Sequence, residues 1–172
     1  MSRFFPHTSY AEDQPLPRVI LTTHVVTRAV AVGSAVGVGV AAVRQAVPPW
    51  RGPDAFSRRL VRASSAGALC GLGLGVVAAA GRMYGRDLVE WQDRSWRLME
   101  NRGQLEVDDW TYLGMAAGVG TAWGAGTLRG MGPRGVVGAA GAGSVAGFLA
   151  WAAWRLGLNG GKYKEKPKEG DL

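Results

Sequence analysis

Four long segments of the chain are almost free of charged side chains, and no other feature constrains the fold as strongly. They cover residues 19–43, 63–81, 112–128 and 135–154. Each has roughly the 17 to 25 residues that a helix needs to cross the hydrocarbon core of a bilayer. We therefore expect an all-α membrane protein with about four Gly/Ala-rich transmembrane helices.

The alternative, a soluble bundle of buried helices, is disfavoured by the glycine content. The chain has 27 glycines in 172 residues, and a glycine inside a soluble helix costs about 1 kcal/mol relative to alanine. The sequence therefore predicts a transmembrane domain over residues 19–157. A tail of residues 1–18 precedes it, and a polar, Lys-rich tail of residues 158–172 follows it.

The glycines of the four segments recur with a spacing of four residues, the pattern of the GxxxG motif. Residues four apart lie on one face of a helix, and a face without side chains lets two helix backbones approach closely in lipid. The sequence therefore predicts that these glycines make the helix–helix contacts of a compact bundle. The predicted helix-packing residues are Gly33, Gly37, Gly67, Gly71, Gly75, Gly114, Gly118, Gly143 and Gly147.

Two polar residues inside the first segment, His24 and Arg28, stand out from their surroundings. A polar side chain within a membrane span is by default a hypothesis for function, here as the lining of a wet groove. The alternative, which we favour for Arg28, is that its long side chain extends to the nearer membrane surface. No carboxylate lies in any of the four segments, and Asp108 or Asp109 is expected to cap the third helix.

A charged stretch with two tryptophans lies between the second and third segments. Residues 86–101 contain neither proline nor glycine and predict an amphipathic helix outside the membrane. Its polar face carries nearly as many acids as bases, whereas helices that bind anionic lipid are rich in Lys and Arg. We favour docking on a protein partner through Trp91, Trp96 and Met99. The alternative is that this helix packs on its own bundle.

The connecting loops differ in charge, and this difference predicts the orientation in the membrane. Residues 44–62 hold five arginines and one aspartate, and residues 129–134 hold two arginines and no acid. Residues 82–111 hold five arginines and seven acids. The positive-inside rule places the two basic loops in the cytoplasm, or in the matrix of an organelle of bacterial origin. Both termini and the amphipathic helix are then expected in the opposite compartment.

The first basic loop also suggests a lipid site. Arg58, Arg59 and Arg62 follow two prolines and fall near the membrane surface. They are candidates for holding an anionic headgroup such as that of cardiolipin. The alternative, that these arginines only set the topology, is the one we favour.

The rest of the composition excludes several classes of function. The single cysteine, Cys70, and the separated His7 and His24 exclude a disulfide framework and a cysteine-based metal site. The net charge of +7 does not indicate nucleic-acid binding, because the arginines are scattered at segment ends. General acid–base catalysis needs a positioned His or carboxylate in a pocket. We therefore expect no enzyme, no cofactor beyond a bound phospholipid, and no small-molecule substrate.

The stretch EWQDRSWRLMENRGQLEVDDW, followed by a Gly/Ala-rich segment, resembles a small family of fungal membrane proteins. That family includes an accessory subunit of mitochondrial respiratory complex I, and the resemblance is best over residues 81–126. More coarsely, four Gly-rich segments with basic first and third loops resemble the Tim-type family of the inner membrane. That second family contains protein-import subunits and another complex I accessory subunit.

The resemblance implies a multi-pass protein of the mitochondrial inner membrane, and together with the loop charges this location predicts both termini toward the intermembrane space. It implies a non-catalytic accessory subunit of NADH:ubiquinone oxidoreductase, whose partners are membrane subunits of that complex and the lipid bilayer. The alternative is a Tim-type component of a protein translocase or channel. Neither resemblance carries a catalytic motif onto this chain.

Overall fold

A computed structural model of the chain describes residues 4–52 and 54–163, and these residues form helices, turns and loops without a strand. Residues 164–172, which make up most of the predicted Lys-rich tail, lie outside the described part. The helices are α1 (Pro17–Ala46), α2 (Phe56–Met83), α3 (Leu88–Glu100), α4 (Arg102–Gly124) and α5 (Gly132–Ala152). A π-helical turn, Ala153–Leu158, continues α5.

Prolines set both ends of the first long helix. Pro17 occupies the first turn of α1, where its missing N–H leaves no hydrogen bond unmade. At the other end, Val47 precedes Pro48 and has an extended backbone, with φ −94° and ψ 105°. A residue before proline avoids helical dihedral angles, so α1 ends at Ala46 as the sequence indicates.

Three helical segments are long and apolar enough to cross a membrane, not four. They are Pro17–Ala46, Phe56–Met83 and Gly132–Leu158, and they indicate that the protein associates with a membrane. The third predicted segment, residues 112–128, belongs to α4, which begins well before it and ends at Gly124. The first turns of α4 carry Arg102, Glu106 and two aspartates, which dilute its apolar character.

The junction of α3 and α4 also corrects the expected caps. The structure has no loop between residue 101 and residue 112, because Asn101 ends α3 and caps α4 directly. The side-chain Oδ1 of Asn101 accepts a hydrogen bond from the backbone N–H of Gln104 at 3.1 Å. Asp108 lies inside α4 and caps nothing.

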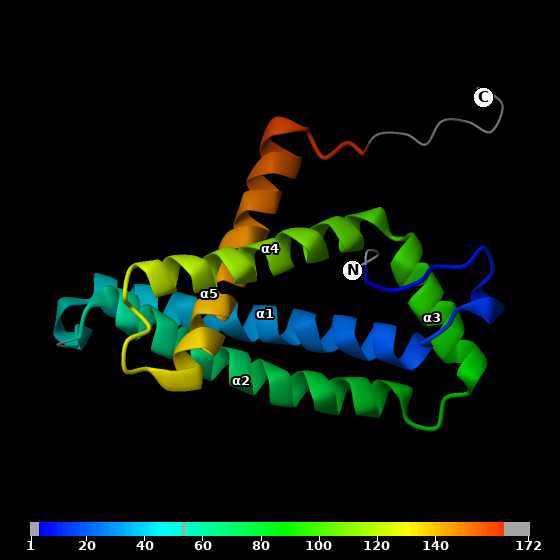
Figure 1. Cartoon of the computed structure of the whole chain (residues 1–172), viewed down its shortest axis with the longest axis horizontal. Helices are drawn as coiled ribbons and strands as arrows, with labels where there is room; N and C mark the ends of the chain where they lie inside the picture. The colour runs from blue at the N-terminus through cyan, green and yellow to red at the C-terminus, as the bar shows by residue number, and fades with distance from the viewer. Residues whose placement is uncertain (1–3, 53, 164–172) are drawn as a thin grey trace.

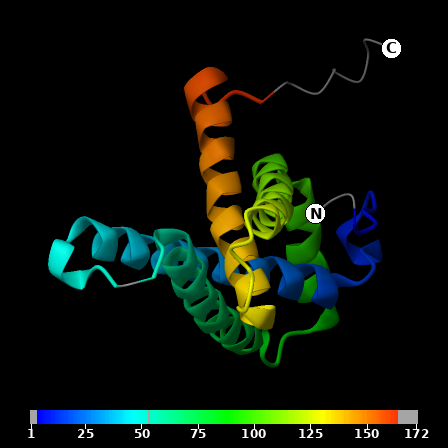
Figure 2. The ribbon, with the colours of Figure 1, turned by 60° about the vertical axis from the view of Figure 1, so that its left-hand side comes forward.

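The helices form two pairs that cross one another. Helices α1 and α2 run side by side as an antiparallel hairpin, and α4 lies over them (Figure 1). Helix α5 packs against α4 and crosses the α1–α2 hairpin steeply (Figure 2). The α1–α2 and α4–α5 connections lie at one end of the hairpin, and α3 lies at the other (Figure 1).

Small residues fill the point where α5 crosses the hairpin. A Cβ on Gly141 of α5 would lie 2.5 Å from the hydroxyl oxygen of Ser34 and 2.6 Å from that of Ser64. Both serines are fully buried. Gly138, one turn earlier, lies against the backbone of Val61 in α2. Only side chains of this size let three helix backbones meet at one place.

Candidate functional site

Glycines hold α1 and α2 together along a face that we call the α1–α2 glycine interface. A Cβ on Gly33 would collide with the carbonyl oxygen of Gly67, and one on Gly67 with that of Gly33. Gly37 has the same relation to Ala63, and Gly71 to Ala29. These are backbone atoms that cannot move aside. The glycines that recur every four residues therefore lie where the two helix backbones are in direct contact.

The α4–α5 glycine interface is built in the same way. Gly114 lies against the carbonyl of Gly143. A Cβ on Gly118 would lie 2.7 Å from the Cα of Gly143. Gly147 meets the carbonyl of Trp110. Gly75, the last of the nine glycines predicted for packing, extends the α1–α2 glycine interface, with a would-be Cβ 2.7 Å from the Cβ of Ala29. All nine glycines therefore lie between helices.

His24 and Arg28, the two polar residues of the first predicted span, meet a buried carboxylate from α4. The Nη2 of Arg28 lies 2.7 Å from Oδ1 of Asp108, and Nδ1 of His24 lies 3.2 Å from Oδ2. The Asp108 side chain is 1% exposed, and that of Arg28 is 26% exposed. Arg28 therefore turns into the protein, and the expected extension to the membrane surface is wrong.

Polar groups of α4 complete this ion cluster of His24, Arg28 and Asp108. Nη2 of Arg28 also donates to the backbone carbonyl and the side-chain Oε1 of Gln104, each at 3.2 Å. The contact of Arg28 with Asp108 Oδ1 is short but lies outside hydrogen-bond angles, so it is an ion pair rather than a linear hydrogen bond. One turn away, the hydroxyls of Thr27 and Tyr112 lie 3.2 Å apart.

The geometry of the ion cluster suits the joining of helices. The α1 and α4 backbones stay further apart than those along the glycine interfaces, and long side chains bridge them. A buried charge is tolerated when it is paired and hydrogen-bonded, and each charged member here has an oppositely charged neighbour.

Sequence reasoning missed Asp108 because it assigned this residue to a helix cap. One signal could have revealed it, because Gln104, Asp108 and Thr111 follow one another at helical spacing and continue the face of the third predicted segment. The same face carries Val107, and Val107, Asp108 and Thr111 are the buried residues of α4.

The predicted docking surface on α3 is largely used within the chain. Met99 is 3% exposed and packs against Ile20 of α1. The indole N–H of Trp96 donates to the carbonyl of Thr8 at 3.0 Å, and its ring lies beside that of His7. Met99 is therefore not a docking residue, and the alternative that α3 packs on its own bundle holds for this face.

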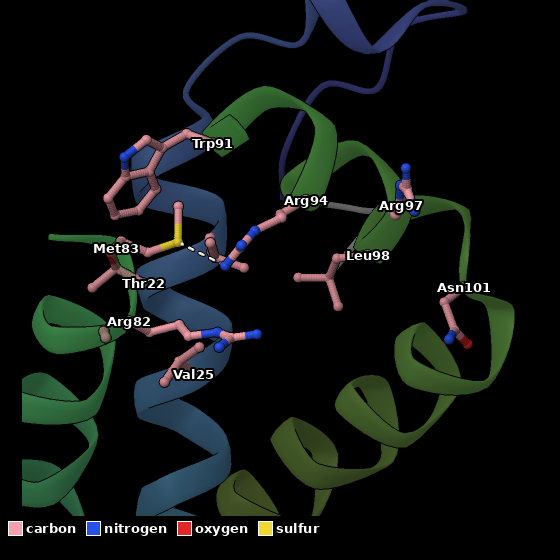
Figure 3. Close-up of a pocket in the computed structure, with 11 residues that line it drawn as sticks. Thr22, Val25, Arg82, Met83, Trp91, Arg94, Arg97, Leu98 and Asn101 are labelled. Atoms are coloured by element: carbon pink, nitrogen blue, oxygen red, sulfur yellow. Dashed lines mark hydrogen bonds between the residues drawn. The ribbon is translucent and has the colours of Figure 1, made fainter. Parts of the chain in front are cut away.

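Trp91 occupies a different position on α3. The guanidinium carbon of Arg18 lies 5.8 Å from the centroid of its ring, within the range of a cation–π contact. The indole also lines an open pocket between α1, α2 and α3 (Figure 3). Trp91, one of the three predicted docking residues, therefore faces a pocket.

The arginines predicted for a lipid headgroup lie in the first two turns of α2. Arg62 pairs with Asp54, and Arg59 donates to the side-chain oxygen of Gln45. Arg58 is exposed. Two of the three arginines are therefore engaged with residues at or beside the loop.

A comparison with protein families finds a match that covers most of the chain. A family model described as "Protein of unknown function (DUF1757)" matches residues 4–149. The chain belongs to this family. The DUF1757 match includes the ion cluster, both glycine interfaces and the whole of α3, and it ends within the last turn of α5. No curated protein matches the chain.

Proposed function

We propose that this DUF1757 protein is a non-catalytic accessory subunit of mitochondrial NADH:ubiquinone oxidoreductase that packs on the membrane arm of the complex. The stretch of residues 90–110, with its resemblance to a fungal family that includes such a subunit, supports the complex. The three long apolar helical segments support the membrane setting.

The proposed structural role rests on the contrast between helix faces that pack within the chain and helix faces that stay exposed. Glycines and other small residues already fill the contacts within the chain. Outside them, α1 and α2 expose rows of large apolar side chains toward their surroundings. Those of α1 are Val32, Val36, Val40 and Val43, and those of α2 are Leu69, Leu72, Leu74, Val76 and Val77. A monomer rarely exposes such continuous apolar surface to water, so lipid and neighbouring membrane subunits are the surroundings that fit.

An apolar groove on α4 and α5 offers a contact surface of a different shape. It has a volume of about 330 Å³, with Trp110, Leu113 and Ala150 among its lining residues and glycines at its floor. A helix of a neighbouring subunit presenting small residues could lie along such a groove. The groove therefore supports a role in packing with other membrane subunits.

The second candidate function is a Tim-type translocase or channel component. The observation in its favour is the ion cluster, because charged residues between membrane helices often mark a transport path. Against this role, His24, Arg28 and Asp108 face one another and not an open cavity. We therefore rank the translocase below the accessory subunit.

The proposed orientation has both termini and α3 toward the intermembrane space, which requires α4 to cross the membrane in addition to the three long apolar segments. The two basic connections lie at the same end of the α1–α2 hairpin (Figure 1). Arg62 and Arg134 line one cavity of about 600 Å³ at that end. A shared basic end supports the positive-inside assignment to the matrix.

Purification of a tagged protein from mitochondria in mild detergent tests the proposal. We expect the protein to co-migrate with NADH dehydrogenase activity on a native gel, together with membrane-arm subunits identified by mass spectrometry. Co-migration with an import complex instead would support the translocase and contradict the accessory-subunit proposal. Migration alone as a small species, under conditions that keep the large complexes intact, would contradict both.

A further inference from the structure

An arginine-rich pocket lies between α1, α2 and α3, at the end of the bundle opposite the basic loops. It has a volume of about 430 Å³ and is lined by apolar residues of all three helices and by three arginines. The arginines are Arg82 at the end of α2 and Arg94 and Arg97 on α3. Among the residues that the structure describes, no acidic side chain lines this pocket.

Two of these arginines lack the carboxylate partners that arginines usually find. Among residues 4–52 and 54–163, Arg82 has no hydrogen bond or ion pair, and Arg94 donates only to the sulfur of Met83 at 3.3 Å. A thioether is a weak acceptor. Figure 3 shows Arg82 and Arg94 extending into the same space, with the Met83 sulfur beside the tip of Arg94. Arg97, by contrast, pairs with Asp93 at 2.9 Å.

The walls of the pocket are apolar and aromatic. Leu21 and Val25 of α1 and Leu98 of α3 contribute the aliphatic surface, and Trp91 closes one side (Figure 3). The indole N–H of Trp91 has no acceptor within the described part of the chain. Tryptophan is enriched at the headgroup level of membranes, where its ring is buried and its N–H can reach a polar group.

We propose that this pocket binds one anionic glycerophospholipid. The phosphate diester lies between the guanidinium groups of Arg82 and Arg94, and the acyl chains continue along the exposed apolar surface of α1 and α2. A headgroup with a cationic choline would bring a further positive charge beside the arginines, so charge complementarity selects a net anionic lipid. The inference rests on the proposed membrane setting but not on assembly into NADH:ubiquinone oxidoreductase.

The site is distinct from the one predicted at Arg58, Arg59 and Arg62. Those residues lie at the start of α2, and Arg82 lies at its end. The arginines at the start have partners in Asp54 and Gln45, whereas Arg82 and Arg94 have unused donors. The proposed lipid therefore occupies the leaflet that faces α3.

Binding to the purified full-length protein in dodecyl maltoside tests the proposal. The probe is phosphatidylglycerol with a fluorescent acyl chain, followed by anisotropy. Unlabelled phosphatidylglycerol is expected to compete, whereas phosphatidylcholine and inorganic phosphate at equal concentration are not. For the Arg82→Gln, Arg94→Gln variant we expect the Kd to rise about 30-fold, since each arginine near an anionic lipid contributes a factor of roughly five. The Arg82→Lys, Arg94→Lys variant should retain most of the binding.

A charge-matched control separates this site from general attraction. The Arg86→Gln, Arg102→Gln variant removes two charges nearby but outside the pocket, and its Kd should change less than about threefold. An equal loss in both variants, or an unchanged Kd for Arg82→Gln, Arg94→Gln, would overturn the proposal. Competition by inorganic phosphate as strong as by the lipid would overturn the assignment to a lipid.

Photo-crosslinking of the wild-type protein gives a test that does not depend on folding of a variant. A phosphatidylglycerol with a diazirine near the headgroup should label peptides from residues 79–101. Labelling confined to residues 58–62 and 134 would overturn the proposed site. Both experiments use the isolated protein, so failure to assemble with NADH:ubiquinone oxidoreductase would leave their outcome unaffected.

Discussion

Arg28 of α1 and Asp108 of α4 form an ion pair of 2.7 Å, with the carboxylate almost completely buried. His24 approaches the second carboxylate oxygen at 3.2 Å. The ion pair therefore joins α1 to α4, whereas the glycine interfaces join α1 to α2 and α4 to α5. The attraction between the two charges contributes little to the net stability, whereas removing one partner would leave the other charge buried and unpaired at a large cost in free energy.

Replacing Asp108 is expected to destabilise the protein. The Asp108→Ala variant leaves Arg28 without its counter-charge between the helices, which should lower the free energy of unfolding by about 3 kcal/mol. Thermal unfolding in mild detergent, followed by circular dichroism, measures the loss. A matched control is Asp93→Ala, because Asp93 forms an exposed pair with Arg97, and this change should cost less than about 1 kcal/mol.

Removing both charges of the pair together should be milder than removing one. In the Arg28→Met, Asp108→Leu variant, apolar side chains replace the ion pair, and such exchanges are often neutral or stabilising. We expect this double variant to unfold at a higher temperature than Asp108→Ala. Equal or greater destabilisation would mean that the charges act with further partners.

Glycines on and off the packing faces should respond in opposite directions. A Cβ on Gly71 collides with the backbone carbonyl of Ala29, whereas a Cβ on Gly73 meets nothing within 4 Å. Gly71→Ala should therefore cost about 1–3 kcal/mol through overpacking. Gly73→Ala should stabilise α2 by about 0.5–1 kcal/mol, because alanine favours the helix. The two substituted glycines are two residues apart in the same helix. Equal melting temperatures of the two variants would contradict the α1–α2 glycine interface.

Larger substitutions extend this comparison to the second helix pair. Gly143→Leu should disrupt the α4–α5 glycine interface, where Gly143 meets the backbone of Gly114. Val76→Leu, at a side chain that is 51% exposed, should leave melting unchanged. Co-purification with the proposed complex gives a second measurement. Normal assembly and heat resistance of Gly143→Leu would mean that α4 and α5 do not pack through these glycines.

Trp96 is expected to hold the N-terminal segment against α3. Its indole N–H donates to Thr8, and its ring contacts His7. Trp96→Ala should remove this hydrogen bond and contact, so trypsin should cut at Arg18 much faster than in the wild type. Trp123→Ala, at an exposed tryptophan, serves as the control. Unchanged cleavage at Arg18 would show that other contacts hold this segment in place.

The orientation in the membrane can be tested with a terminal tag. If both termini face the intermembrane space, protease added to mitoplasts should remove a C-terminal tag without opening the inner membrane. A matrix protein digested only after detergent addition is the control. Protection of the tag until that point would reverse the proposed topology.

The sequence by itself determined three of the four predicted apolar helical segments and the glycines through which the helices pack. Uncharged runs of sufficient length favour helices, and prolines and glycines set where these begin and end. The spacing of the glycines marks one face of each helix whatever the partner, because helical periodicity is local. Residues such as Gly33 and Gly71 could therefore be identified before any contact was known.

Tertiary structure decided which side chains meet. The partner of Arg28 is Asp108, and Ile20, which packs against Met99, comes from α1. Neither relation follows from local spacing, because each depends on how far α4 extends beyond the apolar segment and on the angle at which the helix pairs cross. A buried charge or large apolar side chain needs a partner inside the bundle. The angle at which the helix pairs cross determines which residues are close enough to be that partner.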